Sequence, residues 1–542
     1  MTRALCLLVL FAGCAAADER AGDDDLAASD RYGGTIVIGA NADVADVSPL
    51  TANVQNALYL QQFVLFLPLL AYDSALAPVP RLARSWEIAP DTTAITFHLR
   101  DDVVWQDGVK TSAYDVDFSY DRARDPRTGY IYSGMWEYYR DAEVVDSLTW
   151  RVRLDPHADF LDIWRVFAPS PAHVLRDVAP EQLARHPFGT TSPVGNGPFR
   201  FVERTPGQRW VFEANPDFPA ELGGRPFADR LIYRAIPEPS SLLTELLTGG
   251  VDFYPRVSVD HVARIERSGA ARVITAPDRS WTHIVWNHRR WPFGDRRVRR
   301  ALAHAIDREA IVEAVRAGHG SVANSTVAPV FPQHDPTAGA DLVYDTSRAR
   351  ALLAEAGLAD RNGDGIIEAE DGRPFRFLLS VPQGYPERQA AAEIVQADLR
   401  RAGIDAVLRT VEFNVLIAGA TNPRLRDFDA MLIAWEPEFR IDDSELFGCA
   451  RRDAPAAFTG YCDAGTDALL DSIARTADPV AARPIWSRYQ HRLTGDQPVL
   501  FLYFIEELHA ASARLRDARP DARGDWVGVE RWWISSRPRS AR

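Results

Sequence analysis

The loop at residues 360–371 carries side-chain oxygens at the spacing of a calcium-binding loop. Asp360, Asn362 and Asp364 occupy its first, third and fifth positions, and Asp371 occupies the twelfth. Calcium-binding loops place oxygen ligands at these positions, but their twelfth ligand is Glu, whose side chain is longer than that of Asp. A turn between a helix and a strand is also rich in Asp, Asn and Gly without any metal. We therefore predict a turn without a metal, and calcium held by Asp360, Asn362 and Asp364 is the alternative.

The first two cysteines lie in what the sequence indicates is an export signal. A charged start precedes an apolar run at residues 4–12, and small residues then lead to Cys14. Phe-Ala-Gly-Cys at 11–14 resembles a lipoprotein signal, in which Cys14 becomes the lipidated first residue. The alanines at 15–17 offer a rival cut without lipid. Both routes lead outside the cytoplasm, and the acidic stretch that follows is expected to be a flexible tether.

The other two cysteines, Cys449 and Cys462, stand thirteen positions apart with turn-forming residues between them. In an oxidising compartment this pair is expected to form a disulfide. A zinc site would need further Cys or His nearby at ligand spacing, and the sequence has none there. We therefore predict a bridge and no zinc at this pair.

The common signatures of hydrolases and nucleotide-binding enzymes are missing from the sequence. It has no His-Glu-x-x-His, no Gly-x-Ser-x-Gly and no Gly-x-x-x-x-Gly-Lys-Ser/Thr, and its 12 His are scattered. With 61 basic and 75 acidic residues the formal charge is −14. A net acidic chain argues against nucleic acid, because neutralising phosphates needs a basic face. The sequence therefore favours neither an enzyme nor a nucleic-acid-binding protein.

The chain must fold as more than one domain, because its 542 residues exceed what a single core can bury. The 14 Trp suit the walls of a ligand cleft, with core packing as the alternative for each. Hydrophobic periodicity predicts a core helix at 58–70 and a long helix at 295–316. Ser112 is expected to begin a helix, and residues 193–198 to form a rigid Gly/Pro turn. Strands and helices then alternate to about residue 504, which indicates an α/β fold.

Six stretches carry a family likeness in sequence order. They are GGTIVIGA at 33–40, PRLARSWEIAPDTTAITFHLRDDVVWQDGVKTSAYDVDFSYDRARDP at 80–126, SPVGNGPFRFVE at 192–203, WNHRRWPFGDRRVRRALAHAIDREAIVEAV at 286–315, ARALLAEAGLADRNGDGIIE at 349–368 and AEIVQADLRRAGIDAVL at 392–408. Together they resemble the extracytoplasmic solute-binding proteins of family 5, the receptors for peptides, dipeptides and oligopeptides that serve ABC importers. The likeness covers nearly all of residues 33 to 510.

The resemblance implies a two-lobed periplasmic binding protein fold of type II, with a hinge between the lobes and an extra inserted subdomain. The expected organisation is a signal peptide at 1–13, a tether at 14–31, lobe I at 32–72, 192–287 and 500–542, the inserted subdomain at 73–191, and lobe II at 288–499.

The resemblance also implies where a ligand is held. In such proteins the amine of a bound peptide meets a carboxylate three residues after a Trp, which here are Glu438 and Trp435. Phe413 resembles an aromatic ligand neighbour, and Asn287 stands near the expected hinge. Core packing is the alternative for Trp435 and Phe413, and a solvated loop charge is the alternative for Glu438.

The sequence thus predicts a receptor that captures an oligopeptide by lobe closure and delivers it to the permease of an ABC importer. It is expected to be a monomer, held at the membrane through a lipid on Cys14, with no cofactor and no nucleic acid. A receptor for a nickel chelate, an opine or a sugar is the alternative within the family, and a secreted hydrolase is the alternative outside it. Strict dipeptide specificity is not expected, because the loop at 382–386 lacks the Arg that dipeptide receptors carry there.

Overall fold

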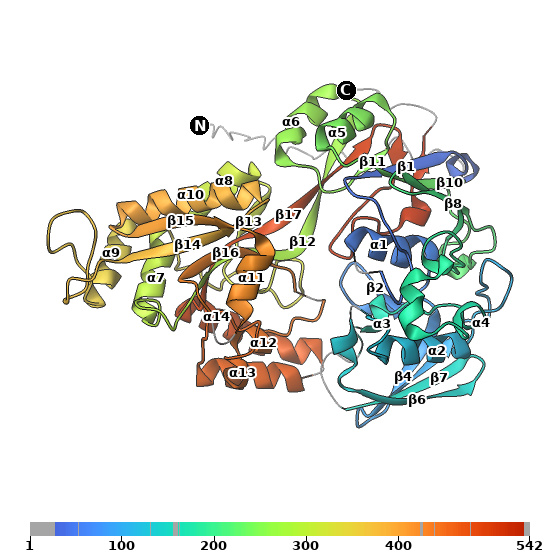
Figure 1. Ribbon diagram of the computed structural model, residues 1–542, viewed down its shortest axis with the longest axis horizontal. Helices are drawn as coiled ribbons and strands as arrows, with labels where there is room; N and C mark the ends of the chain where they lie inside the picture. Colours follow the sequence, from blue (N-terminus) through green and yellow to red (C-terminus); the bar gives the residue numbers. More distant parts are fainter. Residues whose placement is uncertain are drawn as a thin grey trace, which may run out of the picture.

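The computed structural model describes residues 28–52, 54–130, 132–155, 161, 163–422, 426–437, 439–476 and 478–535. Within these ranges the chain forms two lobes of α/β structure, seen on the left and on the right of Figure 1. The two-lobed α/β fold predicted from the sequence is confirmed. The expected signal peptide at 1–13, Cys14, most of the expected tether and Glu438 lie outside the described residues.

One sheet of 11 strands runs through both lobes. Its order is β15-β14-β16-β12-β17-β11-β1-β10-β9-β8, and β13 pairs with β17 off this path. The strands are β1 Thr35–Ala40, β8 Phe199–Thr205, β9 Arg209–Ala214, β10 Arg230–Ala235, β11 Phe253–Tyr254, β12 Ala271–Trp286, β13 Gly320–Val322, β14 Arg376–Pro382, β15 Asp405–Val411, β16 Ala430–Trp435 and β17 Val499–Ser512.

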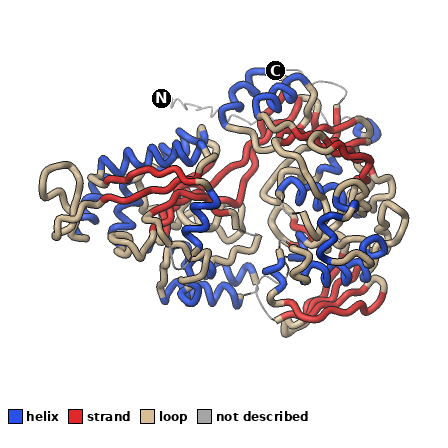
Figure 2. Tube along the Cα trace, in the orientation of Figure 1, coloured by secondary structure: helices blue, strands red, loops and turns tan. Residues whose placement is uncertain are grey.

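The two longest strands, β12 and β17, belong to both lobes. At one end β17 pairs with β11, which in turn pairs with β1 of lobe I. At the other end β12 pairs with β16 of lobe II. Figure 2 shows them as the continuous red strands between the two halves of the molecule. They pair antiparallel, with a register shift between Pro277 and Trp281, opposite Glu506 and Phe504. The change of partners therefore lies inside these strands, before the expected boundary at 287/288.

The shift in register is a bulge that places three residues of β12 opposite one residue of β17. Extra residues on one strand leave the ladder and bend it locally. The bulged residues are Asp278, Arg279 and Ser280, and they stand where the chain passes from one lobe to the other.

A second sheet lies within residues 73–191, the stretch expected to form the inserted subdomain. Its antiparallel order is β4-β5-β7-β6, from β4 Ala83–Ile88, β5 Ala94–Leu99, β7 Thr149–Leu154 and β6 Tyr139–Asp146. Helix α2, Ala113–Arg124, begins at Ser112 as predicted, and its capping box pairs Ser112 with Asp115. Trp150 and Trp164 pack among Phe97 and Tyr120 in the same hydrophobic cluster as β1 of lobe I. The subdomain and lobe I therefore share one continuous core.

Helices cover both faces of the sheet in lobe II. Alternate residues of β16 belong to different cores, with Leu432 in one and Met431 and Ile433 in the other, because successive side chains of a strand point to opposite faces. The helices of this lobe are α7 Arg296–Ala305, α8 Arg308–Arg316, α9 Thr346–Glu355, α10 Pro386–Arg401, α11 Phe413–Thr421, α12 Ser444–Phe447, α13 Ala464–Arg475 and α14 Pro479–Asp496.

Lobe I and its inserted subdomain carry shorter helices and a two-stranded hairpin beside the sheets. They include α1 Gln55–Tyr59, η2 Leu60–Leu65, β2 Leu70–Tyr72, β3 Pro78–Pro80, α3 Ile163–Val166, α4 Ala172–Leu175, α5 Pro239–Thr248, α6 Val259–Ser268, β18 Leu515–Arg516 and β19 Trp533–Ile534.

Two predicted helices were wrong in their extent. The helix expected at 295–316 is interrupted at Ile306, and Asp307 caps α8 by accepting from the N–H of Ala310 at 2.9 Å. The helix expected at 58–70 begins at Gln55 and continues beyond Tyr59 as the wider π-helix η2. In both places the apolar pattern is continuous, so hydrophobic periodicity does not predict the local change in backbone hydrogen bonding.

The turn at 193–198 fixes the end of η2. The backbone N–H groups of Asn196 and Gly197 donate to the carbonyl of Leu65 at 3.0 and 2.8 Å. A Cβ on Gly195 would lie 2.3 Å from that carbonyl oxygen, so the close approach needs glycine. This contact holds the helical segment that carries Tyr59 and Gln62 toward the other lobe.

The predicted disulfide between Cys449 and Cys462 is confirmed, with their Cα atoms 4.6 Å apart. It closes the segment between α12 and α13 in lobe II. No helix in the described ranges combines the length and the apolar character needed to cross a membrane.

Candidate ligand-binding site

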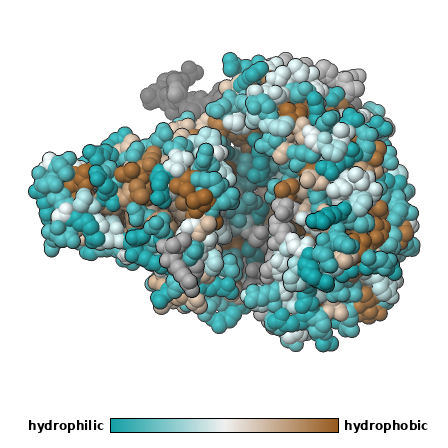
Figure 3. All heavy atoms as spheres, in the orientation of Figure 1, coloured by the Kyte–Doolittle hydropathy of each residue, from teal (hydrophilic) through white to brown (hydrophobic). Residues whose placement is uncertain are grey.

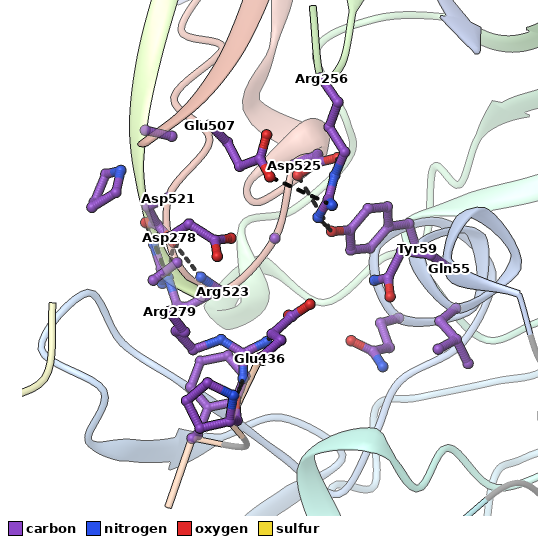
Figure 4. Close-up of a pocket in the computed structure, with 18 of the residues that line it drawn as sticks. Gln55, Tyr59, Arg256, Asp278, Arg279, Glu436, Glu507, Asp521, Arg523 and Asp525 are labelled. Atoms are coloured by element: carbon purple, nitrogen blue, oxygen red, sulfur yellow. Dashed lines mark hydrogen bonds and ion pairs between the residues drawn. The ribbon is translucent and has the colours of Figure 1, made fainter. Parts of the chain in front are cut away.

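A cavity of about 200 Å³ lies between the two lobes. Lobe I contributes residues of α1, the segment after β11, and the loop at 521–525, whereas lobe II contributes the segment after β16. The bulge of β12 and the middle of β17 form its back wall. Figure 3 shows the hollow between the lobes, and Figure 4 shows charged side chains pointing into the cavity. A ligand held here would contact both lobes and the strands that connect them.

Arg256 stands at the centre of the lobe I wall. Its Nε donates to Asp525 Oδ2 at 3.1 Å, its Nη2 to the Tyr59 hydroxyl at 3.3 Å, and Glu507 Oε1 lies 3.6 Å from Nη1. Burial disfavours the charged guanidinium, but attraction to Asp525 and Glu507 outweighs burial and raises the pKa of Arg256. The arginine is therefore a fixed positive charge among carboxylates.

Glu507 is a carboxyl group of this wall whose ionisation is opposed by burial. Its pKa is raised to about 7, mainly by burial and also by the neighbouring charges of Asp278 and Asp525, while Arg256 acts to lower it. Its side chain is 21% exposed, so water reaches it only partly. The carboxylate therefore lacks the solvation and the full pairing that would stabilise its charge.

The lower wall of the cavity is a contact between the lobes, centred on Phe439 of lobe II. The Phe439 ring stacks on Tyr72 of β2 at 5.2 Å between centroids, with 10° between the planes. The guanidinium carbons of Arg165 and Arg279 lie 4.0 and 4.2 Å from the ring centroid. Cation–π and stacking contacts each contribute about 1 kcal/mol. Because Tyr72 and Arg165 belong to the lobe I side, Phe439 ties the lobes together.

Arg279 connects this contact to the bulge of β12. Its Nη2 donates to Glu436 Oε1 at 2.6 Å, and its Nη1 donates to the carbonyl of Pro437. Its side chain is 13% exposed. The passage between the lobes and the segment that carries Phe439 are thus joined through one guanidinium.

A second and less polar cavity of about 410 Å³ lies beside the first. It lies beside the β2–β3 hairpin, with Phe63, Leu222 and Val527 among its apolar residues. The two cavities share Gln62, Arg165, Phe439 and Arg523 in their walls. Together they offer a charged compartment next to an apolar one.

The residues predicted from the family likeness do not come together in this cavity. Trp435 ends β16, is half-buried, and lines a small cavity of lobe II with Trp281 and Phe458. Phe413 begins α11, is 36% exposed, and lies beside Tyr385. Glu438 lies outside the described residues, but its neighbours Glu436, Pro437 and Phe439 all line the interlobe cavity.

Asn287 is buried just after β12, and its side chain bonds to the surrounding backbone. Its amide nitrogen donates to the carbonyls of Arg426 and Phe428 at 3.2 and 2.8 Å, and its Oδ1 accepts from Arg289 N–H at 3.2 Å. These bonds give it a structural role at the lobe II end of β12.

The Trp residues pack mainly into cores and not around the two interlobe cavities. Neither of the two interlobe cavities has Trp among its lining residues. The fully buried ones are Trp105, Trp150, Trp164, Trp210, Trp281, Trp286, Trp526, Trp532 and Trp533. The aromatic surface of the cavities comes instead from Tyr59, Phe63, Tyr72, Tyr132 and Phe439.

The calcium candidate is a turn whose carboxylates bond to its own backbone. Asp360 accepts from the N–H of Gly363 and of Gly365, at 2.7 and 3.0 Å, and Asp364 accepts from Ile366 N–H at 2.8 Å. Asn362 accepts from Asp364 N–H in the same way. Across the part of the chain that the structure describes, no group of three or more His, Cys, Asp or Glu is placed to hold a metal ion.

Sequence reasoning missed most residues of the interlobe cavity. Arg256, Asp278, Glu507 and Asp525 stand in ordinary stretches of sequence and meet because β11, β12, β17 and the C-terminal loop converge. The sequence offered one signal for this site, the charged pair Asp278 and Arg279 in an otherwise largely apolar strand pattern. These charges mark the bulge of β12 that lines the cavity.

Comparisons with known proteins agree with the fold. Residues 77–448 match the family model of the bacterial extracellular solute-binding proteins, family 5. The chain is 30% identical over 368 residues to the oligopeptide-binding protein AppA of Bacillus subtilis, covering 67% of this chain and 66% of that protein. It is 24% identical over 451 residues to the dipeptide-binding protein of Escherichia coli, covering 78% of this chain and 80% of that one.

A solved structure of AppA from Bacillus subtilis, in complex with a nonapeptide, also resembles this chain. The TM-score is 0.74 at 26% sequence identity, and the match covers 93% of this chain and 99% of that one. The likeness extends over both lobes and over the strands that connect them.

Replacing Phe439 with Ala is expected to open the lobes of the ligand-free protein. The change removes the stacking on Tyr72 and the cation–π contact with Arg165, the two contacts that cross to lobe I, together about 2 kcal/mol. This corresponds to a shift of about 30-fold in the ratio of closed to open molecules. Small-angle X-ray scattering should show a larger radius of gyration. Phe413→Ala is the matched control, because Phe413 contacts Tyr385 within lobe II. An unchanged radius for Phe439→Ala would show that this contact does not hold the lobes.

Replacing Glu507 with Gln is expected to stabilise the ligand-free protein at about pH 8. The folded-state pKa of about 7 lies above the ordinary value of 4.5 for a glutamate, so the folded state favours the protonated carboxyl. That contribution is complete below about pH 4.5 and is lost as the pH rises through 7. The variant should raise the free energy of unfolding by about 3 kcal/mol at about pH 8. Denaturant unfolding near pH 4.5 should show no gain, and equal gains at both pH values would contradict the assignment.

Proposed function

Because this chain belongs to the bacterial extracellular solute-binding proteins of family 5, we propose that it captures an oligopeptide between its lobes and delivers it to an ABC importer. The observation that carries the proposal is the cavity at the lobe interface, whose charged walls come from both lobes and from the bulge between them. The family is one of binding proteins, and the proposed work is binding without bond-making.

The bulge and the two shared strands support a hinge mechanism. The bulged residues of β12 lie in the passage between the lobes and interrupt its ladder with β17, so bending there disrupts few backbone hydrogen bonds. Lobe I and the inserted subdomain share one core and would move as a single body against lobe II. A ligand that contacts Arg256 on one side and the segment at 436–439 on the other favours the closed arrangement, since only there can it touch both.

Peptide is supported as the ligand class over the other solutes of the family. The relatives with the higher coverage and identity are named for oligopeptides and dipeptides, and the AppA structure holds a nonapeptide. The paired charges in the first cavity match the two charged ends and the polar backbone of a peptide, and the neighbouring apolar cavity suits its side chains.

Native mass spectrometry of protein purified without refolding tests the peptide proposal. We expect co-purified peptides, and a higher melting temperature after a peptide pool is added to protein stripped of ligand. A hydrolase would shorten the added peptides, whereas a receptor returns them intact. If the protein carries no peptide and a peptide pool produces no thermal shift, the ligand is not a peptide.

We also propose that the mature protein is anchored outside the cytoplasm through a lipid on Cys14. The support is the Phe-Ala-Gly-Cys sequence at 11–14 after an apolar run, together with a family that is extracellular. The intact mass of the mature chain should show the loss of residues 1–13 and the gain of a diacylglyceryl group. Cys14→Ser should move the protein from the membrane fraction to the soluble fraction. A mature chain that begins at Asp18 without lipid would contradict the anchor.

A further inference from the structure

Glu507 lies where β17 passes from one lobe to the other. It stands opposite Ala276 of β12, one position from the pair at which the regular ladder stops and the bulge begins, and it lines the interlobe cavity. On the other side of β17, Val257 N–H donates to the carbonyl of Leu508 at 2.6 Å. Backbone hydrogen bonds on both sides therefore hold this part of β17 in place, and Glu507 is fixed at the passage between the lobes.

The wall around Glu507 places three carboxylates near one arginine. Arg256 Nε donates to Asp525 at 3.1 Å, and Glu507 lies at the longer distance of 3.6 Å from the same guanidinium. The charge of Asp278 acts on both Arg256 and Glu507, and Asp278 forms no ion pair within the described residues. Figure 4 shows Glu507, Asp525 and Tyr59 around the Arg256 guanidinium. This wall therefore carries more negative than positive charge when Glu507 is ionised.

The other charged groups around the cavity are already paired. The pairs are Arg316 with Glu387, Arg279 with Glu436, and Arg523 with Asp521. Arg316, on α8 of lobe II, attracts Glu507 but donates to both oxygens of Glu387, at 3.0 and 2.8 Å. None of the three arginines can turn to Glu507 without weakening its own pair.

Two rings beside Glu507 keep their protonation state near neutral pH. His509 lies two positions along β17 on the same face and is 1% exposed, and burial lowers its pKa to about 4. Burial and the charge of Asp525 raise the pKa of Tyr59 above its ordinary value. Between pH 6 and pH 8 both rings therefore stay uncharged, and neither compensates for a change of charge on Glu507.

Opening of the lobes would change the surroundings of Glu507. Pro437 and Phe439 of lobe II form part of the same cavity, and the charge of Glu436 contributes to the raised pKa of Tyr59 on lobe I. The two walls are thus close enough for their charges to interact. When the walls separate, water enters between them, and a charged carboxylate gains more from water than a neutral carboxyl group does. Ionised Glu507 therefore favours the open arrangement, and protonated Glu507 favours the closed one.

We propose that proton binding at Glu507 promotes closure of the lobes, which makes capture by this receptor sensitive to pH. This regulation rests on the proposed function, because it acts on the same hinge and the same cavity. Closure takes up a proton, so by linkage a ligand that requires the closed lobes binds more tightly at acidic pH.

The size of the effect follows from the two protonation equilibria of Glu507. Its pKa is about 7 in the closed arrangement, and we take the ordinary value of 4.5 for the open one. The added stability of the closed arrangement is complete below about pH 4.5 and is lost as the pH rises through 7. The ratio of closed to open molecules should therefore fall about tenfold from pH 6 to pH 8.

Small-angle X-ray scattering of the ligand-free protein at pH 6 and pH 8, at constant ionic strength, tests the proposal. The unmodified protein is measured beside Phe439→Ala, whose weaker contact between the lobes keeps both arrangements populated if the unmodified protein is closed at both pH values. We expect a larger radius of gyration at pH 8 in at least one of the two proteins. A radius that is equal at both pH values in both proteins, or larger at pH 6, would overturn the proposal.

Three variants, made in whichever protein shows the transition, assign it to Glu507. Glu507→Gln cannot ionise and should keep the radius of pH 6 at both pH values. Asp443→Asn is the matched control, because burial raises the pKa of Asp443 to about 6 but this carboxyl group is not among the residues that line the cavity. It should leave the transition unchanged. A transition that persists in Glu507→Gln, or disappears in Asp443→Asn, would show that Glu507 does not control closure.

Asp278→Asn serves as the third variant if Glu507→Gln does not fold. Asp278 is half-buried, and its charge helps to raise the pKa of Glu507. Removing that charge should move the midpoint of the transition to lower pH, and an unchanged midpoint would contradict the role of this carboxylate cluster.

Failure of this inference is distinguishable from failure of the proposed function. Scattering without ligand reports closure alone, whereas co-purified peptide at a single pH reports capture alone. A protein that captures peptides but has the same radius at pH 6 and pH 8 keeps the proposed function and loses this inference. A protein whose radius changes with pH but that captures no peptide loses the peptide assignment and keeps the closure driven by protons.

Discussion

The antiparallel ladder between β12 and β17 is the constraint on which the rest of this structure depends. These two strands carry the sheet from lobe I into lobe II, so each lobe is completed by strands that the other also uses. A ladder cannot slip by one residue without turning its core face to solvent, and this fixes how the lobes face each other. The bulge at 278–280 places three residues of β12 opposite one residue of β17, and two of them, Asp278 and Arg279, line the cavity.

Charge placement follows from this geometry. A strand that bulges between two lobes exposes side chains that a regular strand would direct into a core or to solvent. Asp278 and Arg279 reach the cavity for this reason, and they divide between its two walls. Arg279 binds the segment of lobe II that carries Phe439, whereas Asp278 stays with Glu507 and Asp525 near lobe I. The passage between the lobes is thus both the proposed hinge and part of the proposed binding site.

Some contacts in the cavity stabilise the closed arrangement of the lobes, and others destabilise it. Phe439, Tyr72 and Arg165 hold the lobes together without a ligand, whereas the burial of Glu507 among other carboxylates disfavours the same arrangement. A group that neutralises the carboxylates would remove the second effect and leave the first. Closure is then sensitive to what fills the cavity, which is the behaviour that a capture protein requires.

The sequence by itself determined the disulfide between Cys449 and Cys462 and the cap at Ser112, because these depend on local spacing and residue type. The family and the two-lobed α/β fold followed from the resemblance of six stretches in sequence order. The resemblance also pointed to the segment after Trp435, and Glu436, Pro437 and Phe439 of that segment line the cavity. It could not determine that Trp435 and Asn287 belong to the interior of lobe II, or that most Trp residues fill cores. Burial depends on what packs from distant parts of the chain, and a residue type does not report it. The site around Arg256, Glu507 and Asp525 was decided by tertiary structure alone, since Arg256 and Asp525 lie 269 positions apart in the sequence. Arg256 reaches Glu507 because β11 pairs with β17.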